Sequence, residues 1–466
     1  MRPLKSITFQ SIVCLLTILI MISCSSNNPK FTGAKGEVKI MTLDPGHFHA
    51  ALVQKSMYPQ VDSTVYVYAP EGDDVKEHLK RIDGYNTRSE NSTQWNEKVY
   101  TSPDFFEKML KDKSGNVMMI AGNNHKKMEY IKATIEAGIN VLADKPMAID
   151  AANFELLKQA FESAKKNGVL LYDIMTERNE ISTLLQKEFS LLPEVFGNLE
   201  MGSLENPSVT KESVHNYFKF VSGSALKRPA WFFDVTQQGE GIVDVTTHLV
   251  DLIQWECFPN QILDYKKDIE VVTAKRWSTK ITPTQFNAVT KLLDYPDYLK
   301  KDLQDTILNV YANGEINYKI KGVHAKVSVI WNYKAPEGAG DTHFSIMRGT
   351  KCNLIIRQGA EQAFKPTLYI ETLAEADTAL FAKTLSENIK KIQQNYPGVE
   401  LKKLLTSWEV VVPDSYKVGH EAHFAQVTQK YLKYLVDGEL PEWEIPNMIA
   451  KYYTTTKALE IAKQNK

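Results

Sequence analysis

The sequence has little cysteine and almost no net charge. Its 466 residues include four cysteines and no CxxC or cysteine–histidine spacing of the kind that binds structural zinc. A disulfide between Cys257 and Cys352 is allowed by this count but not indicated. The formal net charge of -1 provides no long-range attraction to nucleic acid or to anionic membranes. We therefore expect no nucleic-acid partner and a small, weakly charged substrate.

The apolar run near the start of the chain is too short to span a bilayer comfortably. It covers 12–22, follows two basic residues, and is followed by a serine and Cys24. This arrangement resembles a bacterial lipoprotein signal, in which the cysteine is acylated and becomes the new N-terminus. We predict a signal peptide over 1–24, a polar tether over 25–36, and a periplasmic lipoprotein whose only membrane contact is the lipid on Cys24. An uncleaved anchor helix is the alternative.

Beyond the tether, short apolar strands alternate with helical patterns, which is typical of a doubly wound parallel sheet over 37–172. Asp150 is a predicted helix cap and Gly168 a predicted helix stop. The strands are expected over 38–43, 65–68, 117–121, 141–143 and 169–172, and the helices from near His47 and over 105–110, 129–137 and 151–166.

After this region the pattern changes to alternating apolar and polar residues, at 316–320, 325–331 and 353–357. Such alternation indicates antiparallel strands with one solvated face. A helix is expected over 422–436. The predicted fold class is therefore α/β, with an N-terminal doubly wound parallel sheet and a C-terminal α+β domain over 173–466 that has an open, mainly antiparallel sheet.

The first strand-to-helix turn has one glycine where a dinucleotide-binding turn usually has three. Asp44 takes the place of the first glycine, Gly46 keeps the second, and His49 takes the third. Asp44 puts negative charge where phosphates would lie, which is unfavourable unless it caps the helix. His47 and His49 would point different ways once the helix has begun, so we predict no shared metal ion. Both are assigned to the crevice, or to a phosphate or sugar oxygen.

Lys145 comes directly after an apolar strand. Ligands bind at the carboxyl ends of the strands in a doubly wound sheet, so Lys145 is expected to face a crevice. Pro146 restricts the backbone of Lys145 to an extended conformation and thereby fixes its direction. A surface lysine at a turn is the alternative.

A second group of polar residues is spaced as on one helical face. Asp244 and His248 are four residues apart, and Asp251 follows three residues later. A carboxylate, an imidazole and an acid that orients the imidazole suit removal of a proton from a hydroxyl. A capping Asp244 with a buried His248 is the structural alternative, and a metal site lacks an evident third ligand.

Taken in order, these motifs resemble the Gfo/Idh/MocA family, named after glucose-fructose oxidoreductase and inositol dehydrogenase. The family's strand ending in Glu-Lys-Pro corresponds to Asp144-Lys145-Pro146, and its glycine-rich turn before Asp-x-x-x-His-x-x-Asp corresponds to 239–251. Asn124 matches a family strand end, and Trp231 matches the family tryptophan. The long C-terminal part looks like that of lipoprotein members.

The resemblance implies a Rossmann domain and hydride transfer from a sugar, polyol or glycoside hydroxyl to NAD or NADP. His248 would take the hydroxyl proton, Lys145 would stabilise the oxygen, and Asp244 would position the substrate. Trp231 would join these three at the substrate. The residues it implies for the cofactor are Asp44, Gly46, His47, His49, Glu71, Asn124 and Lys145.

Export sharpens this expectation. The signal has no twin-arginine pair, so the chain would cross the membrane unfolded and without cofactor. Outside the cytoplasm we expect no pool of NAD for exchange, so the cofactor should be tightly bound and regenerated in each cycle. One alternative is an NAD-assisted glycosidase or lyase that oxidises, eliminates and reduces. The other is a non-enzymatic carbohydrate-binding lipoprotein that has lost the cofactor.

Three further features are left open. His420 and His423 share one helical face, which we expect to be solvated or packed. The segment 341–345 lies between strands and could reach the substrate. A homo-oligomer could form through the C-terminal sheet.

Overall fold

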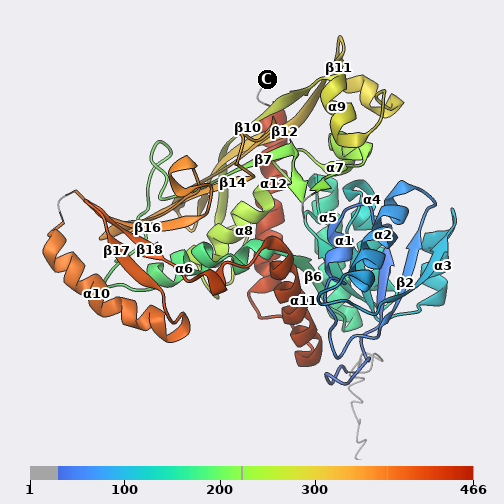
Figure 1. Cartoon of the computed structure of the whole chain (residues 1–466), viewed down its shortest axis with the longest axis horizontal. Helices are drawn as coiled ribbons and strands as arrows, with labels where there is room; N and C mark the ends of the chain where they lie inside the picture. Colours follow the sequence, from blue (N-terminus) through green and yellow to red (C-terminus); the bar gives the residue numbers. More distant parts are fainter. Residues whose placement is uncertain (1–29, 222–223, 375, 465–466) are drawn as a thin grey trace, which may run out of the picture.

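The computed structural model describes residues 30–221, 224–374 and 376–464 (Figure 1). The predicted signal peptide with Cys24, and the first part of the tether at 25–29, lie outside the described residues. Within the described ranges, none of the helices combines the length and apolar content that crossing a bilayer requires. Cys257 and Cys352 are both free thiols.

The N-terminal sheet has six strands, all paired in parallel, in the order β3-β2-β1-β4-β5-β6. This is the Rossmann order, and the predicted doubly wound parallel sheet is confirmed. Chain connections leave β1 and β4 in opposite directions, which opens a crevice at their carboxyl ends. The strands are β1 (Ile40–Leu43), β2 (Thr64–Ala69), β3 (Asn96–Thr101), β4 (Val117–Ile120), β5 (Asn140–Asp144) and β6 (Leu171–Ile174).

The apolar pattern of the sequence predicts some elements of this domain and misses others. Asp150 caps α5 by accepting a hydrogen bond from the Asn153 N–H, and Gly168 ends that helix with φ 63°, both as predicted. Two elements were not predicted: α2 is a largely polar helix, and the edge strand β3 has no buried residue. The helices are α1 (His49–Leu52), α2 (Asp73–Thr87), α3 (Phe105–Asp112), α4 (Asn124–Glu136) and α5 (Ala151–Asn167).

The C-terminal sheet is open and mainly antiparallel, as predicted, with one parallel pair between β13 and β7. The order along the sheet is β10-β12-β13-β7-β14-β15-β16-β18-β17, and β11 pairs with β12. Its strands are β7 (Val209–Phe218), β10 (Ile269–Ile281), β11 (Leu303–Gln304), β12 (Ile307–Ile320), β13 (Val323–Lys334), β14 (Thr342–Arg348), β15 (Cys352–Arg357), β16 (Thr367–Thr372), β17 (Glu400–Lys403) and β18 (Ser407–Val411). A separate short hairpin is formed by β8 (Phe220–Val221) and β9 (Ser224–Ala225).

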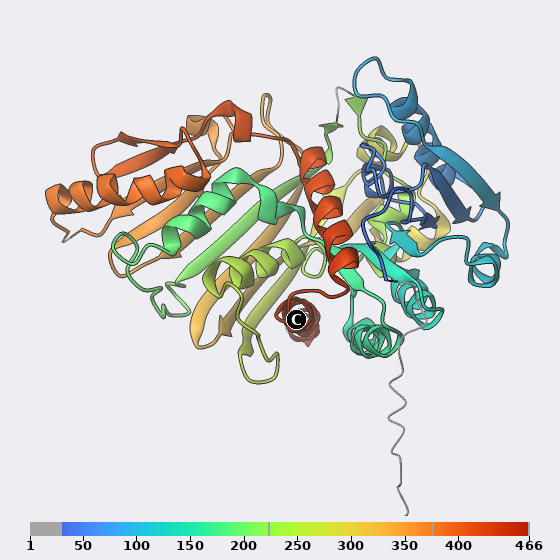
Figure 2. The same ribbon diagram turned by 90° about the horizontal axis from the view of Figure 1, so that it is seen from below.

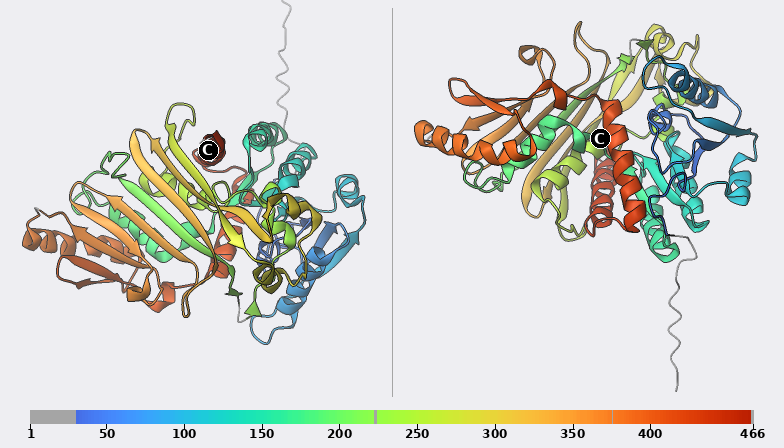
Figure 3. Two further views of the ribbon diagram at one scale, coloured as in Figure 1. Left: turned by 90° about the horizontal axis from the view of Figure 1, so that it is seen from above. Right: turned by 60° about the horizontal axis from the view of Figure 1, so that its bottom comes forward.

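Helices cover one face of this sheet (Figure 2), and the opposite face is turned to the viewer in Figure 3, left. The helices of this part are α6 (Ile181–Ser190), α7 (Val235–Gln238), α8 (Thr246–Cys257), α9 (Pro283–Thr290) and α10 (Thr378–Asn395). The 3-10 segments are η1 (Thr176–Asn179), η2 (Ala230–Phe233), η3 (Asp297–Asp302), η4 (Ala360–Gln362) and η5 (Asp414–Tyr416).

The last two helices, α11 (His420–Asp437) and α12 (Glu444–Gln464), return to the middle of the molecule (Figures 1 and 2). Tyr431 of α11 and Tyr452 of α12 belong to the core of the Rossmann sheet. Ala458 of α12 belongs to the core beneath the C-terminal sheet. The end of the chain therefore binds the two sheets together.

A buried group of charged side chains lies at the same junction. Asp251 of α8 receives Arg178 Nε at 2.6 Å and Lys451 Nζ at 2.9 Å. Lys451 also contacts Asp173 at 2.8 Å, and Arg178 contacts Glu444 at 2.8 Å. Every member is almost fully buried, so each charge depends on its partners for the solvation it has lost.

Candidate active site

A cavity of about 1760 Å³ lies at the carboxyl ends of the Rossmann strands and is lined from both parts of the chain. Lys145, Asp244 and His248 all line it. Lys145 Nζ lies 2.7 Å from Asp244 Oδ1, and the other oxygen of Asp244 accepts a hydrogen bond from Gln238 Nε2 at 3.1 Å. Although burial alone would raise the pKa of Asp244, the Lys145 ammonium and Gln238 hold it below its usual value. The cavity thus holds a fixed ion pair beside an imidazole.

The sequence placed Asp244 on a helix with His248, and this placement is wrong in detail. The helix α8 begins at Thr246, so Asp244 lies in the turn that precedes it. That turn brings the carboxylate to Lys145 instead of stacking it below the imidazole.

His248 lies in the first turn of α8. Burial, and then the nearby Lys145 ammonium, lower its pKa to about 4, so the imidazole is neutral at pH 7. Asp251 does not orient it, contrary to prediction, because both Asp251 oxygens are held by Arg178 and Lys451. The buried Nδ1 of His248 has no hydrogen-bond partner among the residues that the structure describes.

His47 and His49 do not diverge, which corrects the sequence prediction. His47 precedes α1, so its ring is free to turn toward the same group as His49, the first residue of the helix. His47 Nδ1 lies 3.2 Å from Asp144 Oδ2, and His49 Nδ1 lies 3.0 Å from the same oxygen. Although burial alone would raise the pKa of Asp144, the two imidazoles hold it well below its usual range. Burial lowers the pKa of His49 despite that carboxylate.

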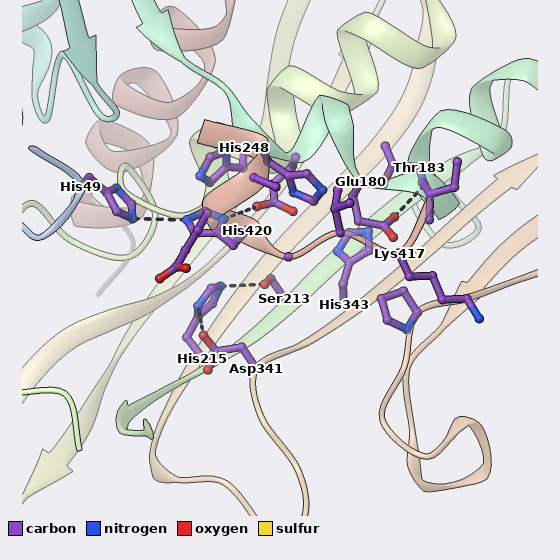
Figure 4. A pocket seen from close by; sticks show the side chains of 18 of the residues that line it. His49, Glu180, Thr183, Ser213, His215, His248, Asp341, His343, Lys417 and His420 are labelled. Carbon is purple, nitrogen blue, oxygen red and sulfur yellow. Dashed lines mark hydrogen bonds and ion pairs between the residues drawn. The ribbon is translucent and has the colours of Figure 1, made fainter. Parts of the chain in front are cut away.

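Helix α11 adds His420 to the site. The sequence predicts only that the helical face carrying this histidine is solvated or packed. His420 Nε2 lies 3.4 Å from His49 Nε2, and the two rings point toward one another in Figure 4. His420 Nδ1 lies 3.7 Å from Glu177 Oε1. Burial would raise the pKa of Glu177, but His420 and His248 lower it. His423, on the same helix, is buried and also lines the cavity.

The C-terminal sheet supplies a further polar group (Figure 4). Asp341 Oδ2 lies 3.1 Å from His215 Nδ1 and 2.6 Å from Lys219 Nζ. Burial would raise the pKa of Asp341, yet these two partners lower it strongly. Asp341 and His343 both line the cavity, so the segment left open in the sequence does reach the site. His215 was not foreseen.

A second cavity of about 310 Å³ lies on the other side of the first turn. It is lined by Asp44, Gly46, Glu71 and Trp231. Trp231 Nε1 donates to Asp74 Oδ2 at 2.9 Å. Trp231 is therefore placed with the glycine of the turn and not with Lys145 and His248, where the resemblance put it.

Asp44 does not cap α1. Its backbone has φ 47°, and its side chain accepts a hydrogen bond from the Tyr130 hydroxyl at 3.0 Å. Burial raises its pKa, with Tyr130 opposing the shift. The aspartate that replaces the first glycine of the fingerprint thus supports the turn by binding α4.

The residues around the turn fit a dinucleotide. His47 and Phe48 line both cavities, so one extended ligand can pass over the turn from one to the other. A Cβ on Gly122, at the end of β4, would collide with the carbonyl oxygen of Asp44, so the turn needs a glycine here. In the small cavity, Glu71 is an acceptor suited to ribose hydroxyls.

Two more residues complete this fit. Arg228 is 4% exposed, lines both cavities, and donates to the carbonyl oxygens of Tyr217 and Asn216. No carboxylate pairs with it among the described residues, so its charge is available to a diphosphate. Burial lowers its pKa to about 10, which leaves it charged at pH 7. Asn124, at the start of α4, lines the large cavity and donates to the Gln238 carbonyl at 2.6 Å.

Fold and site together define a nicotinamide-dependent oxidoreductase. Residues 71–173 match the oxidoreductase family model with an NAD-binding Rossmann fold, and residues 185–463 match the model for an oxidoreductase C-terminal domain. The second match covers more than half of the chain. The chain belongs to the Gfo/Idh/MocA family of oxidoreductases.

Solved structures of similar fold are also described as oxidoreductases or dehydrogenases. A crystal structure described as that of an oxidoreductase from Parabacteroides merdae ATCC 43184 is 60% identical, with a TM-score of 0.93, over 94% of this chain and 100% of that one. An oxidoreductase structure from Thermotoga maritima is 15% identical with a TM-score of 0.58, over 92% of this chain and 99% of that one. A levoglucosan dehydrogenase in complex with NADH and levoglucosan is 13% identical with a TM-score of 0.58, over 92% and 98%. The last two show the shared fold. No curated protein matches the chain.

Proposed function

We propose that this protein oxidises a hydroxyl-bearing carbon of a sugar, polyol or glycoside and keeps its nicotinamide cofactor tightly bound. The observation that carries this proposal is the Lys145–Asp244 ion pair beside the neutral imidazole of His248, in one cavity at the carboxyl ends of the Rossmann strands. A proton acceptor and a fixed positive charge are the two groups that alcohol oxidation requires from the protein.

Each residue of this group has a separate role in the oxidation. The bound nicotinamide supplies the hydride acceptor for the carbon that bears the hydroxyl. The His248 imidazole takes the hydroxyl proton, which it can do because it is neutral at pH 7. Lys145 Nζ donates a hydrogen bond to the same oxygen and stabilises its developing charge. Asp244 holds that ammonium in place.

The polar lining of the cavity supports a carbohydrate as the substrate. Carboxylate, imidazole and ammonium groups line it from both parts of the chain. Asp144 and Lys145 come from the end of β5, and Asp341, His215 and Lys219 come from the C-terminal part. Such alternating donors and acceptors match a ring with several hydroxyl groups. Levoglucosan and L-sorbose are the sugars named with the levoglucosan dehydrogenase structures, which share the fold of this chain.

We further propose that the protein is exported and anchored in the bacterial cell envelope through a lipid on Cys24. The signal-like segment before Cys24 supports this placement. Export without an exchangeable NAD pool favours a cofactor that is reduced and reoxidised on the same enzyme. The open face of the C-terminal sheet is the surface where we expect a second copy to pack.

A second candidate function is an NAD-assisted glycosidase or lyase, in which oxidation is followed by elimination and re-reduction. The volume of the cavity, about 1760 Å³, favours it, because a single monosaccharide beside the nicotinamide end of the cofactor would leave much of that space unfilled. Both candidates use the same proton acceptor and the same ammonium.

One experiment tests the proposal and separates the two candidates. Protein loaded with NAD⁺ is mixed with a panel of sugars, inositols and aryl glycosides, and the absorbance of reduced nicotinamide is followed together with the products. Oxidation predicts a keto product, with reduced nicotinamide that accumulates or returns to NAD⁺ when a second carbonyl is added. Release of a free aglycone would favour the glycosidase, and no chemistry with any member of the panel would contradict both.

The pH dependence follows from the environment of His248. This imidazole faces Lys145, Glu177, His420 and Asp251, and burial and Lys145 outweigh the two carboxylates in lowering its pKa to about 4. The base works only when unprotonated, so kcat/KM should stay level from pH 7 to about pH 5 and fall below that. Return to pH 7 after each low-pH incubation controls for unfolding. A fall centred near the ordinary histidine value of about 6.5 would contradict this assignment.

A further inference from the structure

We propose that His47, His49 and Asp144 bind one divalent transition-metal ion, such as Zn²⁺, in the wall of the large cavity. Each residue offers one ligand atom, and these atoms all lie within 4.8 Å of one another. This inference goes beyond the proposed hydride transfer and does not depend on it.

The distances between the donor atoms match a metal site. Nδ1 of His47 and Nδ1 of His49 lie 3.2 and 3.0 Å from the same Asp144 oxygen. Ligands that surround a first-row ion at about 2.0–2.2 Å are themselves about 2.9–3.5 Å apart. Each imidazole nitrogen is therefore already at the distance from the Asp144 oxygen that two ligands of one ion would have.

The hydrogen bonds around the cluster also favour an ion. His47 Nδ1 is buried and has no hydrogen-bond partner in the described part of the chain, although it faces Asp144. A metal ion would use the lone pair of this nitrogen. Two imidazoles and one carboxylate are a common ligand set for zinc and other first-row ions.

The outer contacts of His49 support the same conclusion. If His49 Nδ1 binds a metal, its Nε2–H can donate to His420 Nε2, and His420 Nδ1–H can then face the Glu177 carboxylate. Metal-binding histidines usually donate their second N–H in this way.

The position of the cluster suggests what the ion does. Asp144 is the neighbour of Lys145, and both histidines line the cavity with His248. Three protein ligands leave coordination positions open. An ion held there can bind a hydroxyl or carbonyl oxygen of the carbohydrate and polarise it alongside the Lys145 ammonium.

Metal binding by the purified full-length protein tests this inference. The protein is stripped with a chelator and titrated with Co²⁺, whose visible absorption reports its ligands, and Zn²⁺ is counted by elemental mass spectrometry. One equivalent of each ion should bind, and the ion should raise the midpoint of thermal unfolding. Absence of stoichiometric binding by the wild-type protein would overturn the inference, whatever the outcome of the activity assays.

Three variants locate the site. His47→Gln and Asp144→Asn should weaken Co²⁺ binding by about 100-fold or more, and Glu177→Gln, which acts through His420, by about 10-fold. His125→Gln is the matched control, because His125 is exposed on α4 and outside the cluster. Equal binding by the ligand variants and the control would place the ion elsewhere and overturn the inference.

Discussion

Replacing His248 with glutamine is expected to lower kcat by about 10²–10⁴-fold while leaving the fold intact, because the variant loses the group that accepts the hydroxyl proton. Glutamine keeps the polar character of the side chain but has no basic nitrogen. Turnover is measured with the best substrate of the panel, on protein whose NAD content has been confirmed. His125→Gln, the same substitution on the surface of α4, should retain full activity.

Lys145→Met should cause a loss of similar size, about 10²–10³-fold in kcat, because the oxygen loses its charged hydrogen-bond donor. Groups that act as one unit are not additive, so the double variant should be little worse than either single one. Near-normal turnover in either single variant, with the cofactor bound, would reject the role assigned to that residue.

Replacing Asp251 with asparagine is expected to reduce the free energy of unfolding by about 3–5 kcal/mol. Arg178 and Lys451 would then remain buried without the carboxylate that both contact. The midpoint of urea unfolding measures this loss. The loss of stability should affect both sheets, because these contacts join α8, η1 and α12.

The matched control removes a carboxylate from an exposed pair. Glu155 lies 2.8 Å from Lys158 on the surface of α5, with its side chain 61% exposed. Glu155→Gln should leave the unfolding midpoint almost unchanged, since solvent already screens this pair. Equal midpoints for the Asp251 and Glu155 variants would mean that the buried group contributes little to holding the two sheets together.

The Rossmann sheet could be predicted because its central strands are buried on both faces and read as short apolar runs. The elements that were missed break this rule. β3 is an exposed edge strand. The helix α12 is buried, but it carries Lys451 and the threonines 454–456 into the interior, so its sequence looks like a solvated segment.

The candidate site divides in the same way. Lys145, Asp244 and His248 were found because each follows a recognisable local motif. Glu177 and His215 carry no local signal, and the helical spacing of His420 and His423 does not show which group they face. Glu177, His215 and His420 come from η1, β7 and α11 and meet only in the folded chain. The convergence of His47 and His49 was missed because it depends on where α1 begins, a detail that the pattern leaves uncertain by a few residues.

The loss of two fingerprint glycines has a structural explanation. Gly46 remains where the turn meets Trp231 and Asp74, and Gly122 supplies a second close approach from β4. Asp44 is held by Tyr130 and does not point freely at a ligand. Different residues thus leave the space that a dinucleotide needs at the turn. Arg228 adds positive charge from the C-terminal part.

The most direct test of this account is to measure the nicotinamide dinucleotide that the protein holds. Purified full-length protein, with and without NAD offered during refolding, is freed of unbound nucleotide, denatured and analysed by mass spectrometry. We expect close to one NAD or NADH per chain after loading, retained through extensive buffer exchange. A folded protein that holds no dinucleotide under any loading condition would contradict it.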